Sequence, residues 1–88
     1  MIFKKNNMIK IKIDLEDLYE EQAKLGDMDK YINIVLDKAG KGNKIILTGR
    51  APVWLYLKIA HALHGKAVSL YYESPVTGEV EVFNHNPF

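Results

Sequence analysis

The fold is decided by residues 45–52, Ile-Ile-Leu-Thr-Gly-Arg-Ala-Pro. Three consecutive large apolar residues are typical of a central strand covered on both faces. Pro52 fits the first position of a helix, where its missing N–H costs nothing. Residues 53–64 are apolar nearly all round and are followed by Gly65, which predicts a helix buried on more than one side. Residues 67–72 predict another strand, so residues 45–72 form a β-α-β crossover between parallel strands.

The segments on either side of this crossover complete a small α/β domain. Apolar residues alternate with polar ones over 9–15, which predicts a strand with one buried face. We expect a short acidic helix over 16–25 and an amphipathic helix over 28–39, because apolar residues recur there at helical spacing. Residues 74–78 predict the turn of a hairpin and residues 80–84 its second strand.

The predicted fold class is α/β, with one domain spanning residues 1–88. We expect a mixed sheet of about four strands, with the β-α-β crossover, a C-terminal β-hairpin and helices packed on the sheet. Ile2 and Phe3, which precede Asn6-Asn7, form a candidate partner strand for the strand predicted over residues 9–15.

The composition excludes several classes of protein. The chain has 88 residues and no cysteine, which rules out a thiolate zinc site, a disulfide framework and a cysteine nucleophile. No apolar run approaches the roughly 18 residues of a membrane span, and the first residues do not resemble a signal peptide. A core this small gains from a partner subunit. We therefore expect a cytoplasmic oligomer that binds neither a membrane nor DNA.

The two signs of charge are segregated, although the net charge is only +1. Seven of the eleven acids lie between Asp14 and Asp29, whereas residues 38–72 contain no acid at all. Two interpretations of the acid-free span stay open. It is either a solvated basic face or a surface that binds an anion.

The first candidate site is the junction of strand and helix at Thr48, Gly49, Arg50 and Ala51. Ligands of open α/β sheets bind at the carboxyl ends of strands. The N–H groups and dipole of a helix start favour phosphate there, and an arginine forks onto phosphate oxygens. The alternative is a tight turn with a surface arginine.

The second candidate site consists of histidines. His61 and His64 lie three residues apart at the end of the predicted helix, and His85 follows the last strand. Imidazoles suit a metal ion or acid–base work, but a histidine near a helix C-terminus is also favoured by the dipole alone. Glu73 and Ser74, at the mouth of the hairpin, are candidate oxygen ligands or ordinary turn residues.

Aromatic residues form a third group, comprising Trp54, Tyr56, Tyr71 and Tyr72. Aromatic rings beside basic groups can stack nucleobases. An aromatic residue in an apolar helix or a strand more often belongs to the core or to a subunit contact. We expect Trp54 to be a core residue.

The stretch Ile46–Leu55, followed by Ala60-His61, resembles the signature of the small CRISPR-associated "Csx-three" family. Its members carry a hydrophobic strand, a Ser/Thr-Gly-Arg-Gly-Pro-Ile/Val-Trp-Leu string, an Ala-His pair and a hairpin whose far strand ends in histidine. Gly78 and His85 match this last element. Ala51 replaces the second glycine of the string, and His64 matches a further family histidine only approximately. The nearest counterpart of the family's hairpin aspartate is Glu73 or Ser74. The family's hairpin arginine would fall near Val76, so this chain lacks it.

The resemblance implies a ring nuclease that cleaves cyclic tetra-adenylate to linear products and so switches off type III CRISPR signalling. It implies a homodimer, two of which sandwich the ligand as a tetramer, and a dependence on manganese. The implied ligand-binding residues are Thr48, Gly49, Arg50, Ala51 and Ser74. The implied catalytic residues are His61, His85 and Glu73, and the implied metal ligands are His61, His64 and His85. A binding module for cyclic oligoadenylate or short RNA, a manganese-dependent RNA 3′-exonuclease and a plain scaffold remain as alternatives.

Overall fold

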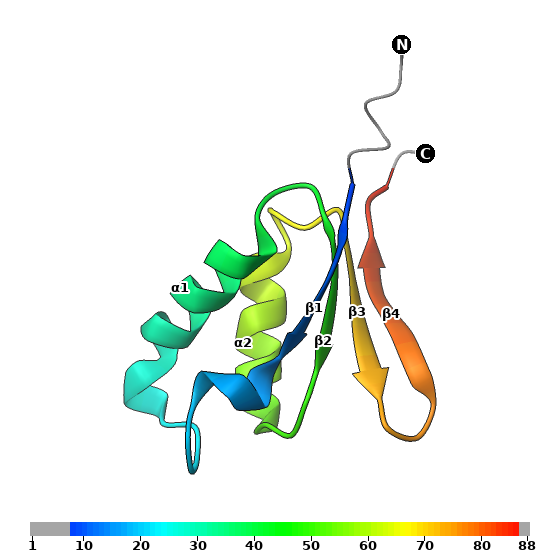
Figure 1. Ribbon diagram of the computed structural model, residues 1–88. Coiled ribbons are helices and arrows are strands. Elements are labelled where there is room, and N and C mark those ends of the chain that lie inside the picture. Colours follow the sequence, from blue (N-terminus) through cyan, green and yellow to red (C-terminus); the bar gives the residue numbers. More distant parts are fainter. Residues whose placement is uncertain (1–7, 87–88) are drawn as a thin grey trace.

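The computed structural model describes residues 8–86, which form one four-stranded sheet and two α-helices (Figure 1). The strands are β1 (Lys10–Asp14), β2 (Lys44–Thr48), β3 (Ser69–Ser74) and β4 (Gly78–Asn84), and they lie side by side in this order. β1, β2 and β3 are parallel, and β4 is antiparallel to β3. This confirms the α/β class, the crossover and the hairpin. The candidate strand at Ile2 and Phe3 lies outside the described residues.

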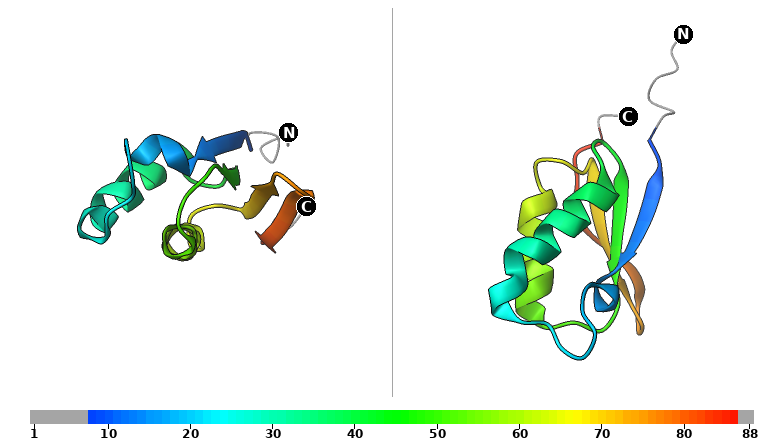
Figure 2. Two further views of the ribbon diagram at one scale, coloured as in Figure 1. Left: turned by 90° about the horizontal axis from the view of Figure 1, so that it is seen from below. Right: turned by 60° about the vertical axis from the view of Figure 1, so that its left-hand side comes forward.

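Both helices cover the same face of the sheet (Figure 2). α1 (Met28–Ala39) connects β1 to β2, and α2 (Val53–Leu63) connects β2 to β3. Each crossover steps one strand further in the same direction, so two right-handed connections place their helices on one side. No helix among residues 8–86 has the length and apolar character needed to span a membrane.

The core lies between the helices and the covered face of the sheet. α1 contributes Tyr31, Val35 and Ala39, which recur every four residues as the amphipathic pattern predicted. α2 buries only one stripe, formed by Leu55, Ile59 and Leu63. Val53 and Leu57 of α2 are exposed, because the helix is covered on one side only within this chain. Trp54 is partly buried at the edge of the core rather than inside it.

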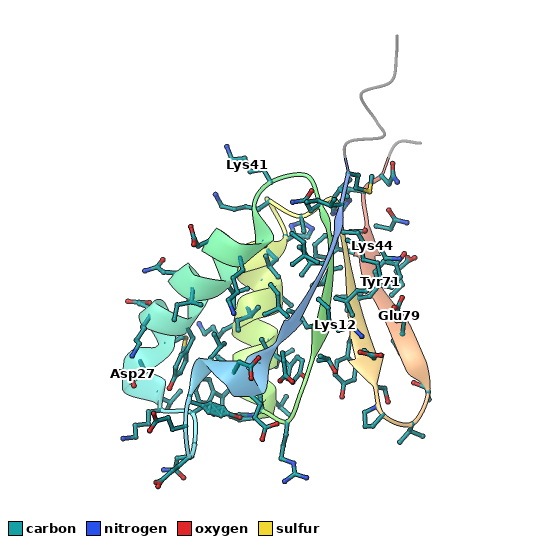
Figure 3. All side chains as sticks on the ribbon, viewed as in Figure 1. Lys12, Asp27, Lys41, Lys44, Tyr71 and Glu79 are labelled. Atoms are coloured by element: carbon teal, nitrogen blue, oxygen red, sulfur yellow. The ribbon has the colours of Figure 1, made fainter. Side chains whose placement is uncertain are left out.

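The face of the sheet opposite the helices, here called the uncovered face, carries charged side chains and one fully buried apolar residue. Ile46 is fully buried there, although its neighbours Ile45 and Leu47 point to the other face, into the core. Lys12 of β1 and Tyr71 of β3 flank Ile46 in register, and Figure 3 shows Lys12, Lys44, Tyr71 and Glu79 distributed over the strands. Long side chains therefore cover Ile46 with their apolar parts.

The prediction of an acidic helix over residues 16–25 is wrong. The structure has two short 3-10 helices instead, η2 (Leu15–Leu18) and η3 (Leu25–Asp27). Closely spaced acids repel one another on a helix, and a helix this short is only marginally stable without a continuous apolar stripe. Asp14 begins η2, because its side chain accepts a hydrogen bond from the Glu16 N–H at 2.9 Å.

The pairing of β3 with β4 contains a register shift between Leu70 and Tyr71. Glu81 pairs with Tyr71, but Phe83 rather than Val82 pairs with Leu70. The irregularity turns Phe83 toward the covered side, where its ring lies 5.0 Å from that of His64.

Candidate functional site

The loop between β2 and α2 lies at the carboxyl ends of the parallel strands, at the lower end of the molecule in Figure 1. β2 ends at Thr48, and α2 begins at Val53. Pro52 is the N-cap, with an extended backbone (φ −65°, ψ 151°). It therefore precedes the first helical position, which the sequence predicted it to occupy. The Leu55 N–H donates to the carbonyl of the N-cap residue Pro52 at 3.1 Å, whereas the N–H groups of Val53 and Trp54 precede the first carbonyl that α2 could offer them. An anion at this position would therefore find main-chain donors and the positive end of the helix dipole.

Gly49 is the position at which the loop turns. Its φ is +102°, a conformation that glycine adopts readily and other residues rarely. A Cβ atom here would overlap the carboxylate of Asp14 at the end of β1. The loop therefore packs directly against the first strand, and only glycine fits at this position.

Replacing Gly49 with alanine should destabilise the fold more than the same change at Gly42. Gly42 also has a positive φ, of 71°, but a Cβ there would meet nothing within 4 Å. Gly42→Ala therefore pays the backbone strain alone, about 1–2 kcal/mol. Gly49→Ala adds overpacking against Asp14, about 1–3 kcal/mol more. Urea denaturation of both variants measures the difference, and equal losses would show that Asp14 yields freely.

Two tyrosine hydroxyls hold the carbonyl groups of this loop. The Tyr19 hydroxyl donates to the Arg50 carbonyl at 2.6 Å, and the Tyr56 hydroxyl donates to the Gly49 carbonyl. Burial, with smaller contributions from Tyr72 and Asp14, raises the pKa of Tyr56 to about 12. Burial also raises the pKa of Tyr19, assisted by Glu16 and Asp14. Both hydroxyls therefore stay protonated, as donors, at neutral pH.

A groove beside this loop gathers the ligand-binding residues expected from the sequence. Its wall includes Thr48, Gly49, Arg50 and Ala51 from the loop, and Glu73 and Ser74 from the end of β3. Its apolar part comes from α2 and the hairpin and includes Val53, Tyr56, Leu57, Tyr72 and Val82. β4 extends the sheet beyond α2. The side of α2 that faces the hairpin of β3 and β4 is therefore left open, and this opening is the groove.

Glu73 lines the groove but its carboxylate is engaged on the uncovered face. It lies 2.9 Å from Lys12 Nζ, and this contact raises the pKa of Lys12. The main-chain carbonyl of Glu73 accepts a hydrogen bond from the Thr48 hydroxyl at 3.4 Å. Ser74 stabilises the hairpin turn, because its Oγ accepts hydrogen bonds from the Val76 and Thr77 N–H groups at 3.1 and 3.3 Å.

The histidines lie at the other end of α2. His64 and His85 are exposed, and their Nε2 atoms are 3.2 Å apart. His85 is held beside the helix end because its N–H donates to the Val68 carbonyl at 2.8 Å. His61 is exposed in the last turn of α2. Within residues 8–86, no group of three or more His, Cys, Asp or Glu side chains is placed to hold a metal ion.

The His64–His85 pair does not fit manganese in a single chain. Manganese prefers carboxylate, carbonyl and water oxygens, whereas paired imidazoles suit zinc, copper or nickel. No metal-capable carboxylate completes the pair among the residues that the structure describes.

The structure places the two candidate sites, the loop and the histidines, at opposite ends of α2. Arg50 precedes α2, and His61 lies in its last turn. A helix rises 1.5 Å per residue, so His61 lies about 12 Å and His64 about 16 Å along the helix axis from Val53. The loop and the histidines of one chain therefore do not reach the same phosphate.

Sequence reasoning missed three residues that shape the loop, namely Asp14, Tyr19 and Tyr56 as a hydroxyl donor. Asp14 could have been found, because it ends a parallel strand at the same edge as the loop. The hydroxyl contacts of Tyr19 had no signal in the sequence, since they join residues 31 positions apart across an irregular segment.

The family comparison agrees with the resemblance seen in the sequence. The sequence model of the family described as CRISPR-associated protein (Cas_csx3) matches residues 22–88, which is most of the chain and includes the loop, the hairpin and all three histidines. No curated protein and no solved structure shows a significant match. The family match covers well over half of the sequence, and this chain therefore belongs to the CRISPR-associated Cas_csx3 family.

Proposed function

We propose that the protein is a cytoplasmic ring nuclease that binds cyclic tetra-adenylate and cleaves it to linear products, which switches off type III CRISPR signalling. One observation carries this proposal. In a chain of a CRISPR-associated family, Thr48, Gly49, Arg50, Ala51 and Ser74 line one groove at the carboxyl ends of the strands.

The binding step would rest on charge and main-chain donors. Arg50 is exposed and forms no ion pair with a carboxylate among residues 8–86, so its guanidinium is available to fork onto phosphate oxygens. The helix start adds N–H groups and a favourable dipole. Tyr56 and Tyr72 in the same groove provide ring surfaces for a nucleobase.

The cleavage step would be an attack by a ribose 2′-hydroxyl on the adjacent phosphorus. The new O–P bond forms a 2′,3′-cyclic phosphate, and the bond to the 5′-oxygen breaks. A base takes the 2′-hydroxyl proton and an acid gives one to the leaving 5′-oxygen. His61 and His85 are the proposed acid–base groups, and the loop donors stabilise charge on the phosphorane. Glu73 is less suited to this role while its carboxylate is paired with Lys12.

A second copy would have to complete the site, because the loop and the histidines lie at opposite ends of α2. We propose a homodimer, two of which enclose the ligand, so that histidines of one dimer act on a ligand held by the loops of the other. Exposed apolar side chains suit a subunit contact. Val53 and Leu57 on α2 and Val80 and Val82 on β4 are exposed in the single chain.

Binding without cleavage is the second candidate function. It is favoured by the same separation of the histidines from the loop, since one dimer alone would hold the ligand and leave it intact. Short RNA is the alternative ligand. A manganese-dependent RNA exonuclease is the least favoured activity, because the paired histidines lack a carboxylate beside them.

Chromatography of cyclic tetra-adenylate after incubation with the protein tests the proposal. Parallel samples contain manganese or a chelator, and a linear RNA serves as a second substrate. We expect linear products from the ring in both samples. Intact ring that co-elutes with the protein would establish the binding module, and cleavage of linear RNA only with manganese would establish the exonuclease. Intact ring without co-elution would overturn the proposal.

Replacing Arg50 with alanine should weaken binding of cyclic tetra-adenylate about 10- to 150-fold, the effect of losing a charged hydrogen bond of roughly 1.5–3 kcal/mol. Arg50→Lys should recover part of the affinity, because it keeps the charge and loses the fork. Lys41→Ala is the matched control, since it removes one positive charge in the loop after α1, at the other end of the molecule (Figure 3). Isothermal titration calorimetry measures all three. Equal losses for Arg50→Ala and Lys41→Ala would indicate a diffuse charge effect instead of a site.

A further inference from the structure

The loop that lines the groove is held by its carbonyl oxygens. The Gly49 and Arg50 carbonyls accept hydrogen bonds from Tyr56 and Tyr19 respectively. These carbonyls belong to two successive peptide groups, and the peptide bonds described here are trans. A trans peptide group is planar, and its C=O and N–H point in opposite directions. Holding the two carbonyls therefore also fixes the directions of the Arg50 and Ala51 N–H groups.

The two tyrosines are themselves fixed by different parts of the fold. The Tyr19 ring packs edge-on against Tyr31 of α1, with 6.3 Å between centroids. The Tyr56 ring packs edge-on against Tyr72 of β3, with 5.1 Å between centroids. Each hydroxyl is thus aimed at the loop by a packed ring, and the loop is held from the α1 side and from the sheet side at once. Gly49 adds a third restraint through its close approach to Asp14.

We propose that Tyr19 and Tyr56 are positioning residues of the phosphate site, which preset the Arg50 and Ala51 N–H groups as donors to a ligand phosphate. This inference rests on the proposed function, since the ligand is cyclic tetra-adenylate. It adds to Arg50 a pair of main-chain donors and two tyrosine hydroxyl groups that act only through the loop. A preset donor loses no conformational freedom when the ligand binds, so its contribution to affinity is retained.

Single hydroxyl deletions test the proposal. Tyr19→Phe and Tyr56→Phe each remove one hydrogen bond to the loop and keep the ring. Tyr31→Phe is the matched control, because it keeps the ring contact with Tyr19 and removes only a hydrogen bond that the Tyr31 hydroxyl accepts from the Lys24 N–H at 3.0 Å, outside the loop. Titration calorimetry with cyclic tetra-adenylate should show about a 3- to 10-fold loss of affinity for each of the first two variants. The control should bind as the wild type does.

A spectroscopic measurement separates positioning from a general loss of stability. In ¹⁵N–¹H NMR spectra of the wild-type protein, the Arg50 and Ala51 amide protons should move downfield when cyclic tetra-adenylate is added. Under saturating ligand the Ala51 shift should shrink in Tyr19→Phe and the Arg50 shift should shrink in Tyr56→Phe. If a variant fails to fold, the wild-type shifts alone decide, and unmoved Arg50 and Ala51 amides overturn the inference.

The two proposals fail in different ways. Wild-type protein that does not bind cyclic tetra-adenylate overturns the proposed function and the positioning role with it. Wild-type protein that binds the ring, together with Tyr19→Phe and Tyr56→Phe variants that bind it equally well, overturns the positioning role alone.

Discussion

His61→Ala should lower the rate of cyclic tetra-adenylate cleavage by about 10²–10⁴-fold, the range for loss of a general acid or base. Binding of the ring should be unchanged, because His61 lies at the far end of α2 from the loop. Rapid-quench assays at saturating ligand measure the rate, and calorimetry measures the affinity. A His61→Ala protein with the wild-type cleavage rate would remove this residue from the mechanism.

Mixing two impaired variants tests whether the proposed site lies between copies. Arg50→Ala protein lacks the proposed binding residue, and His61→Ala protein lacks the proposed acid–base residue. If the loop of one copy works with the histidine of another, mixed assemblies contain some intact sites and activity reappears. Mixing each variant with more of itself is the control. No recovery in assemblies shown to exchange subunits would place both residues in one chain's site and contradict the separation seen here.

Leu55→Ala should lower the free energy of unfolding by about 2–5 kcal/mol, because it leaves a cavity where a leucine was fully buried. Leu57→Ala is a control on the same helix with the same change of side chain. Leu57 is 65% exposed, so its replacement should change the stability of the single chain by less than about 0.5 kcal/mol. Denaturation at low protein concentration measures both. Equal losses would mean that α2 is not oriented as described.

The same pair of variants reports on assembly. Leu57 lies in the exposed apolar group proposed as the subunit contact, so Leu57→Ala should weaken the dimer and leave the fold intact. Sedimentation velocity over a range of concentrations shows this directly. A dimer of unchanged strength would move the contact away from this side of α2.

The elements with strong periodic patterns could be predicted from the sequence. Tyr31, Val35 and Ala39 recur at helical spacing, and α1 has the bounds that this spacing implies. The apolar run at 45–47 is the centre of β2, as expected of a central strand, but the helices cover only one of its faces and long side chains cover Ile46 on the other. These predictions succeeded because local pattern and burial agree there.

The failures have several causes. The acidic segment after β1 had helical spacing but too little apolar surface to form a helix. The register shift in β4 depends on its pairing with β3. The separation of Arg50 from His61 could have been predicted, because the eight helical steps from Val53 to His61 add about 12 Å. The hydroxyl contacts of Tyr19 could not.

The lysine side chains that cover Ile46 affect how a polyanion would approach the protein, because they are paired with carboxylates. Lys12 and Lys44 keep their stems over the sheet by pairing with Glu73 at 2.9 Å and Glu79 at 4.0 Å, and Lys44 also lies over the Tyr71 ring. Their charges are thereby largely cancelled at short range, so the broad flat face offers a phosphate chain little attraction. Arg50 carries no such neutralising partner among the described residues. This distribution of charge favours encounters of a polyanion with the loop at the end of the sheet over adsorption to the broad face.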